Sequence, residues 1–151
     1  MTSAPPAAIE HPDLHARVAA SFARQGLMRH LQARLGRVAP GEVEIWLPYS
    51  ERVTQQQGGF HGGAMGAIGD IAGGYAAFTT VAEDMEVVTV EYKINFLAMH
   101  KDGMLRATGH VVRAGRRLIV ARTDVSHVAD DGKTLPCAVL QQTMMPVPRT
   151  D

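Results

Sequence analysis

The stretch HGGAMGAIGDIAGGYAA, residues 61–77, constrains the fold more than any other part of this sequence. Its length and apolar content are typical of a helix, yet each interior glycine costs a helix about 1 kcal/mol relative to alanine. On a helical wheel, the larger side chains share a side that can pack on a sheet: Ile68, Ile71, Tyr75 and Phe78. The glycines lie nearly opposite, as a bare stripe of backbone: Gly62, Gly66, Gly69 and Gly73. The sequence therefore predicts a long helix that another group approaches closely, at a functional site or by packing against another helix or a subunit partner.

Asp70 lies at the edge of this glycine stripe. No lysine or arginine occurs between His61 and Val81, so a local ion pair on a solvated face cannot explain the carboxylate. Its neighbours one helical turn away are small: Gly66, Ala67, Gly73 and Gly74. The pattern leaves two interpretations open, a functional carboxylate or one that faces water or a neighbouring backbone group.

Helical and alternating patterns before this helix predict a leading helix and a hairpin. Residues 11–25 read as a helix with Gly26 as its C-cap. Two extended runs between Met28 and Tyr49, HLQARLGRV and EVEIWLPY, predict the hairpin, and a polar loop follows at residues 50–60.

The remainder of the sequence predicts strands. Apolar residues alternate with polar ones from Val88 to Phe96, which indicates a long strand with one buried face. Three turns join this strand to three further ones, which predicts an antiparallel meander of four strands: residues 101–103, 115 and 130–132. The expected fold class is α+β, with one main helix packed against one antiparallel sheet.

Length and charge indicate one domain and exclude several partners. A chain of 151 residues fits one core, expected at residues 28–147, after a tail and leading helix at 1–27 and before a tail at 148–151. Lys+Arg and Asp+Glu are equal at 15 each, so the chain lacks the basic surface that binds nucleic acid or anionic membranes. Neither is expected as a partner.

The cysteine and histidine pattern predicts no disulfide and no metal site. Cys137 stands alone, and neither a leader pattern nor an apolar run of about 20 residues occurs, which favours a cytoplasmic protein. Without an evident base, Cys137 is expected to pack in a strand. His11 and His15 have the spacing of a metal pair, but no third ligand lies nearby.

The start of the glycine-rich helix suggests carbonyl chemistry. His61, Gly62 and Gly63 present unpaired N–H groups at the positive end of the helix dipole, where an oxygen that becomes negative is stabilised. In the preceding loop, the amides of Gln55–Gln57 can hold a water molecule or a reacting group. With the nearby carboxylate, these groups suit attack on a thioester, whose thiolate leaves readily without a Ser-His-Asp triad. No serine lies in a G-x-S-x-G motif.

These residues resemble a known family. The spacing of Gln55, Gly62 in HGG and Asp70, followed by a long strand ending in NFL and a Gly-Arg-Arg turn, resembles the hotdog-fold acyl-CoA thioesterases, especially the PaaI-like phenylacetate-degradation group, over residues 28–146. The resemblance implies a long central helix wrapped by a curved antiparallel sheet. It also implies a homodimer with active sites at the subunit interface, and no cofactor, because coenzyme A belongs to the substrate.

The resemblance also implies residue roles. Asp70 would act as general base or nucleophile, the Gly62 N–H would polarise the thioester carbonyl, and Gln55 would position water or substrate. His61 is a further catalytic candidate, although a residue entering a helix more often makes structural hydrogen bonds. In some relatives a Ser or Thr stands where this chain has Gly74, so a hydroxyl-assisted mechanism is in doubt.

Substrate contacts are expected at two places. Gly63, Phe60 and Met65, together with the facing subunit, are expected to bind the acyl group. The arginines around Gly115 either meet the phosphates of coenzyme A or form a charged hairpin turn: Arg113, Arg116 and Arg117. The sequence leaves both interpretations open.

The leading functional hypothesis is hydrolysis of acyl-CoA thioesters to free acid and coenzyme A. A non-catalytic acyl-CoA-binding or sensing module is the alternative, and it needs an unseen partner. A hotdog-type acyl hydratase or dehydratase ranks below both, because the His-Phe-Pro-Gly signature is missing. The acyl group, the choice between dimer and tetramer, and the choice between nucleophile and general base cannot be read from the sequence.

Overall fold

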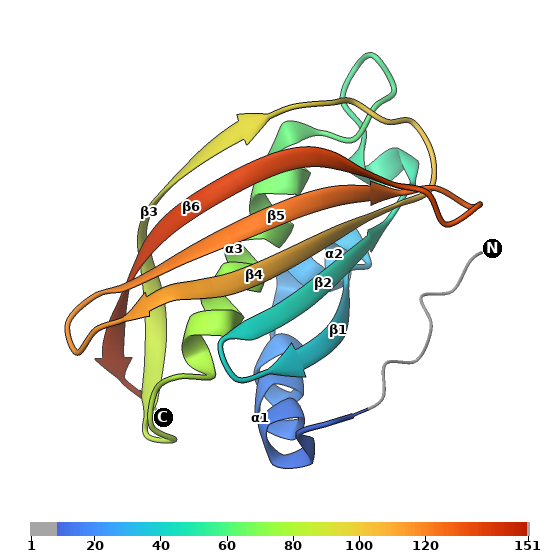
Figure 1. Cartoon of the computed structure of the whole chain (residues 1–151). Helices are drawn as coiled ribbons and strands as arrows, with labels where there is room; N and C mark the ends of the chain where they lie inside the picture. The colour runs from blue at the N-terminus through green and yellow to red at the C-terminus, as the bar shows by residue number, and fades with distance from the viewer. Residues whose placement is uncertain (1–8, 151) are drawn as a thin grey trace.

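The computed structural model describes residues 9–150, which form a curved six-stranded sheet around one long helix (Figure 1). The helix is α3, Gly62–Phe78. The strands follow the order β1-β2-β4-β5-β6-β3, with every neighbouring pair antiparallel. Their bounds are Arg34–Ala39 for β1, Glu42–Pro48 for β2, Met85–Phe96 for β3, Met104–Ala114 for β4, Ile119–Val128 for β5 and Thr134–Pro148 for β6. The predicted α+β arrangement, a central helix wrapped by an antiparallel sheet, is confirmed. The predicted meander of four consecutive strands is wrong for β3, which pairs with β6 and not with β4, because the chain from Phe96 to Met104 crosses to the other side of the β5–β6 hairpin instead of turning back as a hairpin.

Tight turns and one long return set this strand order. The β1–β2 and β5–β6 hairpins turn at Gly41 and Gly132, whose φ angles of +74° and +84° favour glycine. The chain leaves β2, passes through the short 3-10 helix Glu51–Val53 and α3, and then adds β3 at the far edge beside β6. As a result, α3 lies across the concave face of the sheet (Figure 1).

The hydrophobic core fills the space between α3 and the sheet. The inward series of β2 is fully buried, as the alternation of this strand predicts: Val43, Ile45 and Leu47. Ile68 of α3 and Leu105 of β4 are likewise fully buried in the same cluster. Within residues 9–150, no helix has the length and apolar character needed to cross a membrane.

The glycine stripe of α3 faces the sheet of the same chain, so the interpretation that it packs against another helix is wrong, and packing against a subunit partner stays a prediction. A Cβ on Gly69 would lie 3.0 Å from a methyl of Leu140, and one on Gly73 would lie 2.0 Å from the Gln142 amide oxygen. Both neighbours belong to β6. The physical reason is the curvature of the sheet: α3 contacts β2, β3, β4, β5 and β6, so the glycine side and the Ile68 side of the helix are both covered.

The N-terminal region differs from its prediction. The first helix, α1, spans Pro12–Phe22, and a second helix, α2, occupies Gly26–Leu31. Gly26 therefore begins a helix rather than capping one, and the strand expected within HLQARLGRV starts only at Arg34. Met28 and Leu31, three residues apart, are both buried, a helical spacing, and Gln32 ends α2 with a left-handed φ of +59°.

The expected buried face of β3 is also absent. Val88, Val90, Tyr92 and Phe96 are between 44% and 58% exposed. β3 pairs only with β6 and forms the edge of the sheet, and its register shifts between Thr89 and Glu91. The alternating pattern correctly predicts the strand, but the shift divides its apolar residues between two faces. Val88 pairs with the exposed Met145 on the outer face. Tyr92 and Phe96 lie over Gly66 and Gly62 of α3, and Ile94 between them is half-buried against the core.

Gly109→Ala is expected to lower the free energy of unfolding by about 1–3 kcal/mol or more, because its Cβ would lie 2.4 Å from the backbone of Ala72 in α3. Urea unfolding followed by circular dichroism measures this effect. Gly74→Ala is the matched control, since a Cβ there meets nothing within 4 Å, and alanine should stabilise the helix by about 0.5–1 kcal/mol. Equal stabilities of the two variants would contradict the close helix–sheet approach.

Candidate active site

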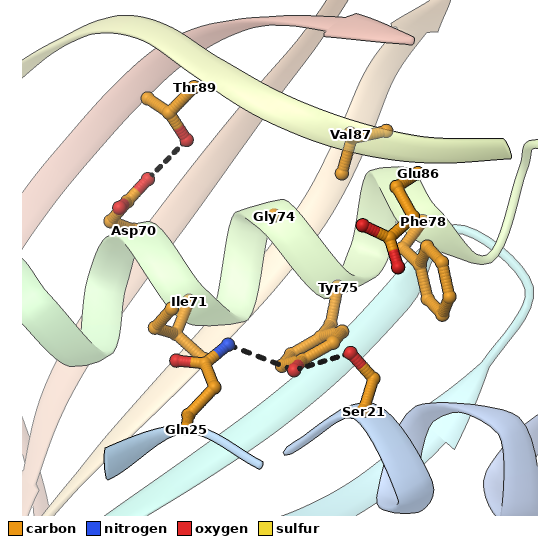
Figure 2. A pocket seen from close by; sticks show the side chains of 10 residues that line it. All are labelled: Ser21, Gln25, Asp70, Ile71, Gly74, Tyr75, Phe78, Glu86, Val87 and Thr89. Carbon is orange, nitrogen blue, oxygen red and sulfur yellow. Dashed lines mark hydrogen bonds between the residues drawn. The ribbon is translucent and has the colours of Figure 1, made fainter. Parts of the chain in front are cut away.

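Asp70 is held in the middle of α3 by neutral hydrogen-bond donors. The Thr89 hydroxyl on β3 donates to Asp70 Oδ1 at 2.7 Å, and the Gln142 amide on β6 donates to the same oxygen at 2.9 Å (Figure 2 draws the Thr89 bond). No cation pairs with this carboxylate among residues 9–150. This half-buried carboxylate therefore has no counter-ion in the described chain and can contact a substrate or a water molecule.

Neither donor is among the site residues expected from the sequence. Gln142 is 1% exposed and occupies an inward position of β6, between the buried Leu140 and Met144. A polar residue in an inward, otherwise apolar series is a signal that the sequence contains. Thr89 carries no comparable signal, because threonine is common in strands.

A pocket of about 210 Å³ opens beside Asp70, between α1, α3 and β3 (Figure 2). Its apolar wall consists of Ile71, Tyr75, Phe78 and Val87. Gly74, one turn after Asp70, contributes no side chain, and nothing lies within 4 Å of where its Cβ would be. The carboxylate therefore stands at an open hollow with both polar and apolar walls, large enough to take part of a small molecule.

Hydrogen bonds to the Tyr75 hydroxyl connect the polar side chains at one end of the pocket. This hydroxyl accepts a hydrogen bond from the Gln25 amide at 2.9 Å and donates to Ser21 Oγ at 3.1 Å (Figure 2). Ser21 belongs to α1, and Gln25 immediately precedes α2. The N-terminal helices thus form one side of the pocket.

His61 caps the start of α3. Its Nδ1 accepts a hydrogen bond from the Gly63 N–H at 2.7 Å, so the structural role weighed for His61 is present. The Gly62 N–H has no partner among the described residues, and the Phe96 ring occupies the space that a Cβ on Gly62 would need. The free N–H fits the role that the resemblance implies for Gly62.

Gln55 lies in the loop that leads into α3. Its amide nitrogen is 3.3 Å from Gln57 Oε1 and 3.0 Å from Met99 Sδ, and its oxygen accepts from the Gln57 N–H. The loop closes on itself where the Gln55 N–H donates to the Gly59 carbonyl at 2.9 Å. Gln55, His61 and Gly62 therefore gather near the N-terminus of α3.

Asp70 lies apart from this group. Eight residues separate Gly62 from Asp70, about 12 Å along a helix at 1.5 Å per residue. A single thioester carbonyl cannot contact both the Gly62 N–H and the Asp70 carboxylate of one chain. The predicted catalytic residues are thus divided between two places on the same helix.

Phe60 and Met65 are core residues. Phe60 is 1% exposed and packs edge-on against Tyr49, and Met65 is 4% exposed with its sulfur 3.7 Å from Cys137 Sγ. Neither offers a surface to an acyl group in the described chain, and neither lines the pocket beside Asp70. Burial raises the pKa of the Cys137 thiol, which supports its predicted packing role over a nucleophilic one.

The three arginines lie at the β4–β5 turn. Arg113, Arg116 and Arg117 are exposed, and none forms an ion pair with an acidic residue in the described part of the chain. The paired residues Ala114, Ile119, Met144 and Thr89 form one row across the sheet. Three strand spacings, about 14 Å, therefore separate this turn from Thr89.

A stacked histidine pair supports the Gln55 loop. The rings of His100 and His127 lie 3.8 Å apart and parallel, and His127 Nε2 is 3.0 Å from the Asp102 carbonyl oxygen. The His100 carbonyl accepts from the Phe60 N–H at 3.0 Å. Burial, and then the neighbouring His127, lower the pKa of His100, while Asp102 opposes the shift. Residues 9–150 contain no group of three or more metal-ligating side chains.

Comparison with known proteins identifies relatives of this chain. Residues 57–132 match the family model of the Thioesterase superfamily. A candidate esterase from Saccharolobus solfataricus is 35% identical over 107 residues, which cover 71% of this chain and 74% of that protein.

Solved structures share the fold. A thioesterase family protein from Silicibacter pomeroyi superposes with a TM-score of 0.85 at 37% identity, covering 90% of this chain and 99% of that one. The PaaI protein from the E. coli phenylacetic acid degradation operon superposes with a TM-score of 0.80 at 18% identity, covering 92% of this chain and 96% of that one. The latter likeness shows a common fold.

The lowered pKa of His100 predicts a loss of stability in acid. In the unfolded chain His100 binds a proton at the ordinary histidine pKa of about 6.5, whereas in the folded chain it binds the proton only at a lower pH. The free energy of unfolding should therefore fall as the pH drops below about 6.5. Urea unfolding measured at a series of pH values should show a weaker acid dependence for His100→Gln. An acid dependence identical to that of the wild type would contradict the assignment.

Proposed function

Because this chain belongs to the thioesterase superfamily, we propose that it hydrolyses acyl-CoA thioesters to a free acid and coenzyme A. The observation that carries the proposal is the Asp70 carboxylate, which neutral donors hold beside an open pocket. We propose that the acyl group enters this pocket, whose apolar wall includes Ile71, Phe78 and Val87.

The reaction needs one base and one group that polarises the carbonyl. As general base, Asp70 takes a proton from water while the water oxygen attacks the thioester carbon. The carbonyl oxygen becomes negative and is stabilised by the Gly62 N–H at the helix N-terminus. The C–S bond then breaks, the carbonyl re-forms, and the thiolate of coenzyme A takes up a proton. As nucleophile, Asp70 would attack the same carbon, form an anhydride, and be released by water.

The separation of Asp70 from Gly62 favours a site built from two chains. We propose a homodimer in which Asp70 of one chain acts with Gly62 and Gln55 of the partner subunit. The exposed apolar side chains of β3 support this arrangement, since Val88 and Val90 flank Thr89 beside Asp70 and Phe96 packs on Gly62. An edge strand with exposed apolar side chains is a surface that a second copy can cover.

The rest of coenzyme A requires a polar surface. We propose that the arginines of the β4–β5 turn meet its phosphates, because guanidinium groups bind phosphate in two-pronged geometry. Their exposure and their lack of acidic partners within residues 9–150 support this role: Arg113, Arg116 and Arg117.

A sensing module is the second candidate function. It would bind acyl-CoA without hydrolysing it, yet a carboxylate beside the acyl group would then only weaken binding. The environment of Asp70 therefore favours catalysis. A hydratase or dehydratase finds no support in the family to which the chain belongs.

Asp70→Asn is expected to lower kcat by about 10²-fold or more, because asparagine can neither take a proton nor attack the carbonyl. Thiol release from short, medium, long and aryl acyl-CoAs measures the effect and identifies the preferred acyl group. Asp84→Asn, at an exposed position after α3, is the matched control and should retain wild-type activity. Full activity of Asp70→Asn would contradict the proposed mechanism, and binding without turnover by the wild type would favour the sensing module.

Mixing two inactive parents tests the shared site. Asp70→Asn and Gln55→Ala subunits, unfolded together and refolded, should form mixed dimers that each contain one intact site, with activity rising towards about a quarter of the wild-type value. A site contained in one chain predicts no activity above the mean of the two parents. The same mixing of Asp70→Asn with itself provides the baseline.

A further inference from the structure

Gln142 is a fully buried polar residue beneath the centre of α3. Its side chain comes from β6, is 1% exposed, and lies 72 residues from Asp70 in the sequence. Leucine or methionine at this position would pack in the core without needing hydrogen bonds. The presence of an amide here therefore calls for a role beyond filling the core.

The amide donates to Asp70 at two atoms. Gln142 Nε2 is 2.9 Å from Asp70 Oδ1 and 3.2 Å from the Asp70 carbonyl oxygen. Both acceptors are oxygens, so this orientation of the amide is the one that the hydrogen bonds require. One side chain thus holds the carboxylate and the backbone segment that carries it.

The other end of the amide is left without a partner. Gln142 Oε1 is buried and accepts no hydrogen bond in the described chain. A buried polar atom without a partner destabilises the folded state. The orientation of Asp70 is therefore obtained at a cost in stability, which is a pattern expected of functional sites.

The glycine at position 73 makes room for this amide. A Cβ on Gly73 would lie 2.0 Å from Gln142 Oε1 and 3.0 Å from Thr123 Oγ1. Thr123 on β5 is also fully buried and donates to the Gly69 carbonyl at 3.1 Å. Two polar side chains of the sheet, Gln142 and Thr123, therefore hydrogen-bond to the turn of α3 that carries Asp70. They reach it beside Gly73, where the helix has no side chain.

We propose that Gln142 is a positioning residue for thioester hydrolysis, which holds the Asp70 carboxylate towards the pocket, and that Gly73 admits it. The inference rests on the proposed function of Asp70. Thr89 holds the same oxygen from the solvent side at 2.7 Å, so the loss of Gln142 frees the carboxylate to rotate away from its productive direction without removing its charge.

The test replaces the amide by an apolar side chain of similar size. Gln142→Met should lower kcat about 10- to 100-fold with little change in KM, because misplacement of a reacting group affects the chemical step. Gln141→Met is the matched control, since Gln141 is exposed and points to the opposite side of β6. Gly73→Ala should reproduce the loss of kcat by displacing the amide, and it serves as a second variant should Gln142→Met fold poorly.

Two further measurements separate positioning from structure. In an Asp70→Asn background, Gln142→Met should cause no further loss of kcat, because both changes act on one group. The ¹³C chemical shift of the Asp70 carboxyl should change in Gln142→Met and remain at its wild-type value in Gln141→Met. Additive losses of kcat, or an unchanged carboxyl shift, would overturn the positioning role. If the wild type hydrolyses no acyl-CoA, the proposed function fails, and the carboxyl shift alone still decides whether Gln142 holds Asp70.

Discussion

The close approach of α3 to the concave face of the sheet is the contact on which the rest of this structure depends. Gly109 on β4 leaves no room for a Cβ against the backbone of Ala72 in α3. Gly69 and Gly73 on the helix let the β6 side chains Leu140 and Gln142 approach closely. Protein interiors are packed as densely as organic crystals, so a gap or an overlap of one methyl group is felt throughout such an interface. The cost of glycine in a helix is thus offset by backbone-close packing over the length of α3.

This packing also creates the environment of Asp70. Because the helix lies so near the sheet, a side chain of β6 can reach past Gly73 to the carboxylate, and β3 can reach it from the edge. The opposite flank of the same helical turn is bare at Gly74 and opens to the pocket. One turn of helix is therefore held firmly on one side and accessible on the other, which suits a group that must act on a bound molecule.

The two groups proposed to act on the thioester, the Gly62 N–H and the Asp70 carboxylate, lie apart because both belong to one rigid helix. Helical geometry fixes Gly62 and Asp70 about 12 Å apart, and no loop motion can shorten that distance while α3 remains intact. A second copy is the simplest source of the missing half of the site. The apolar side chains that β3 exposes at the edge of the sheet in a single chain provide a surface with which a second copy can associate.

The sequence by itself determined where the four strands after residue 84 lie along the chain, the long glycine-rich helix, the α+β class, and the choice of Asp70 and Gly62 as candidates. These features follow from the local periodicity of apolar residues and from residue spacing along one helix, both of which can be read directly from the sequence. Only the tertiary structure decided what covers each face. It turned the glycine stripe towards the sheet and buried Phe60 and Met65. It also divided the apolar residues of β3 between two faces and extended the N-terminal helices through Leu31. A helical wheel shows which residues share a face of a helix, but not which element packs against that face. The contact between Gln142 and Asp70 joins residues far apart in the chain, so no local pattern could specify it.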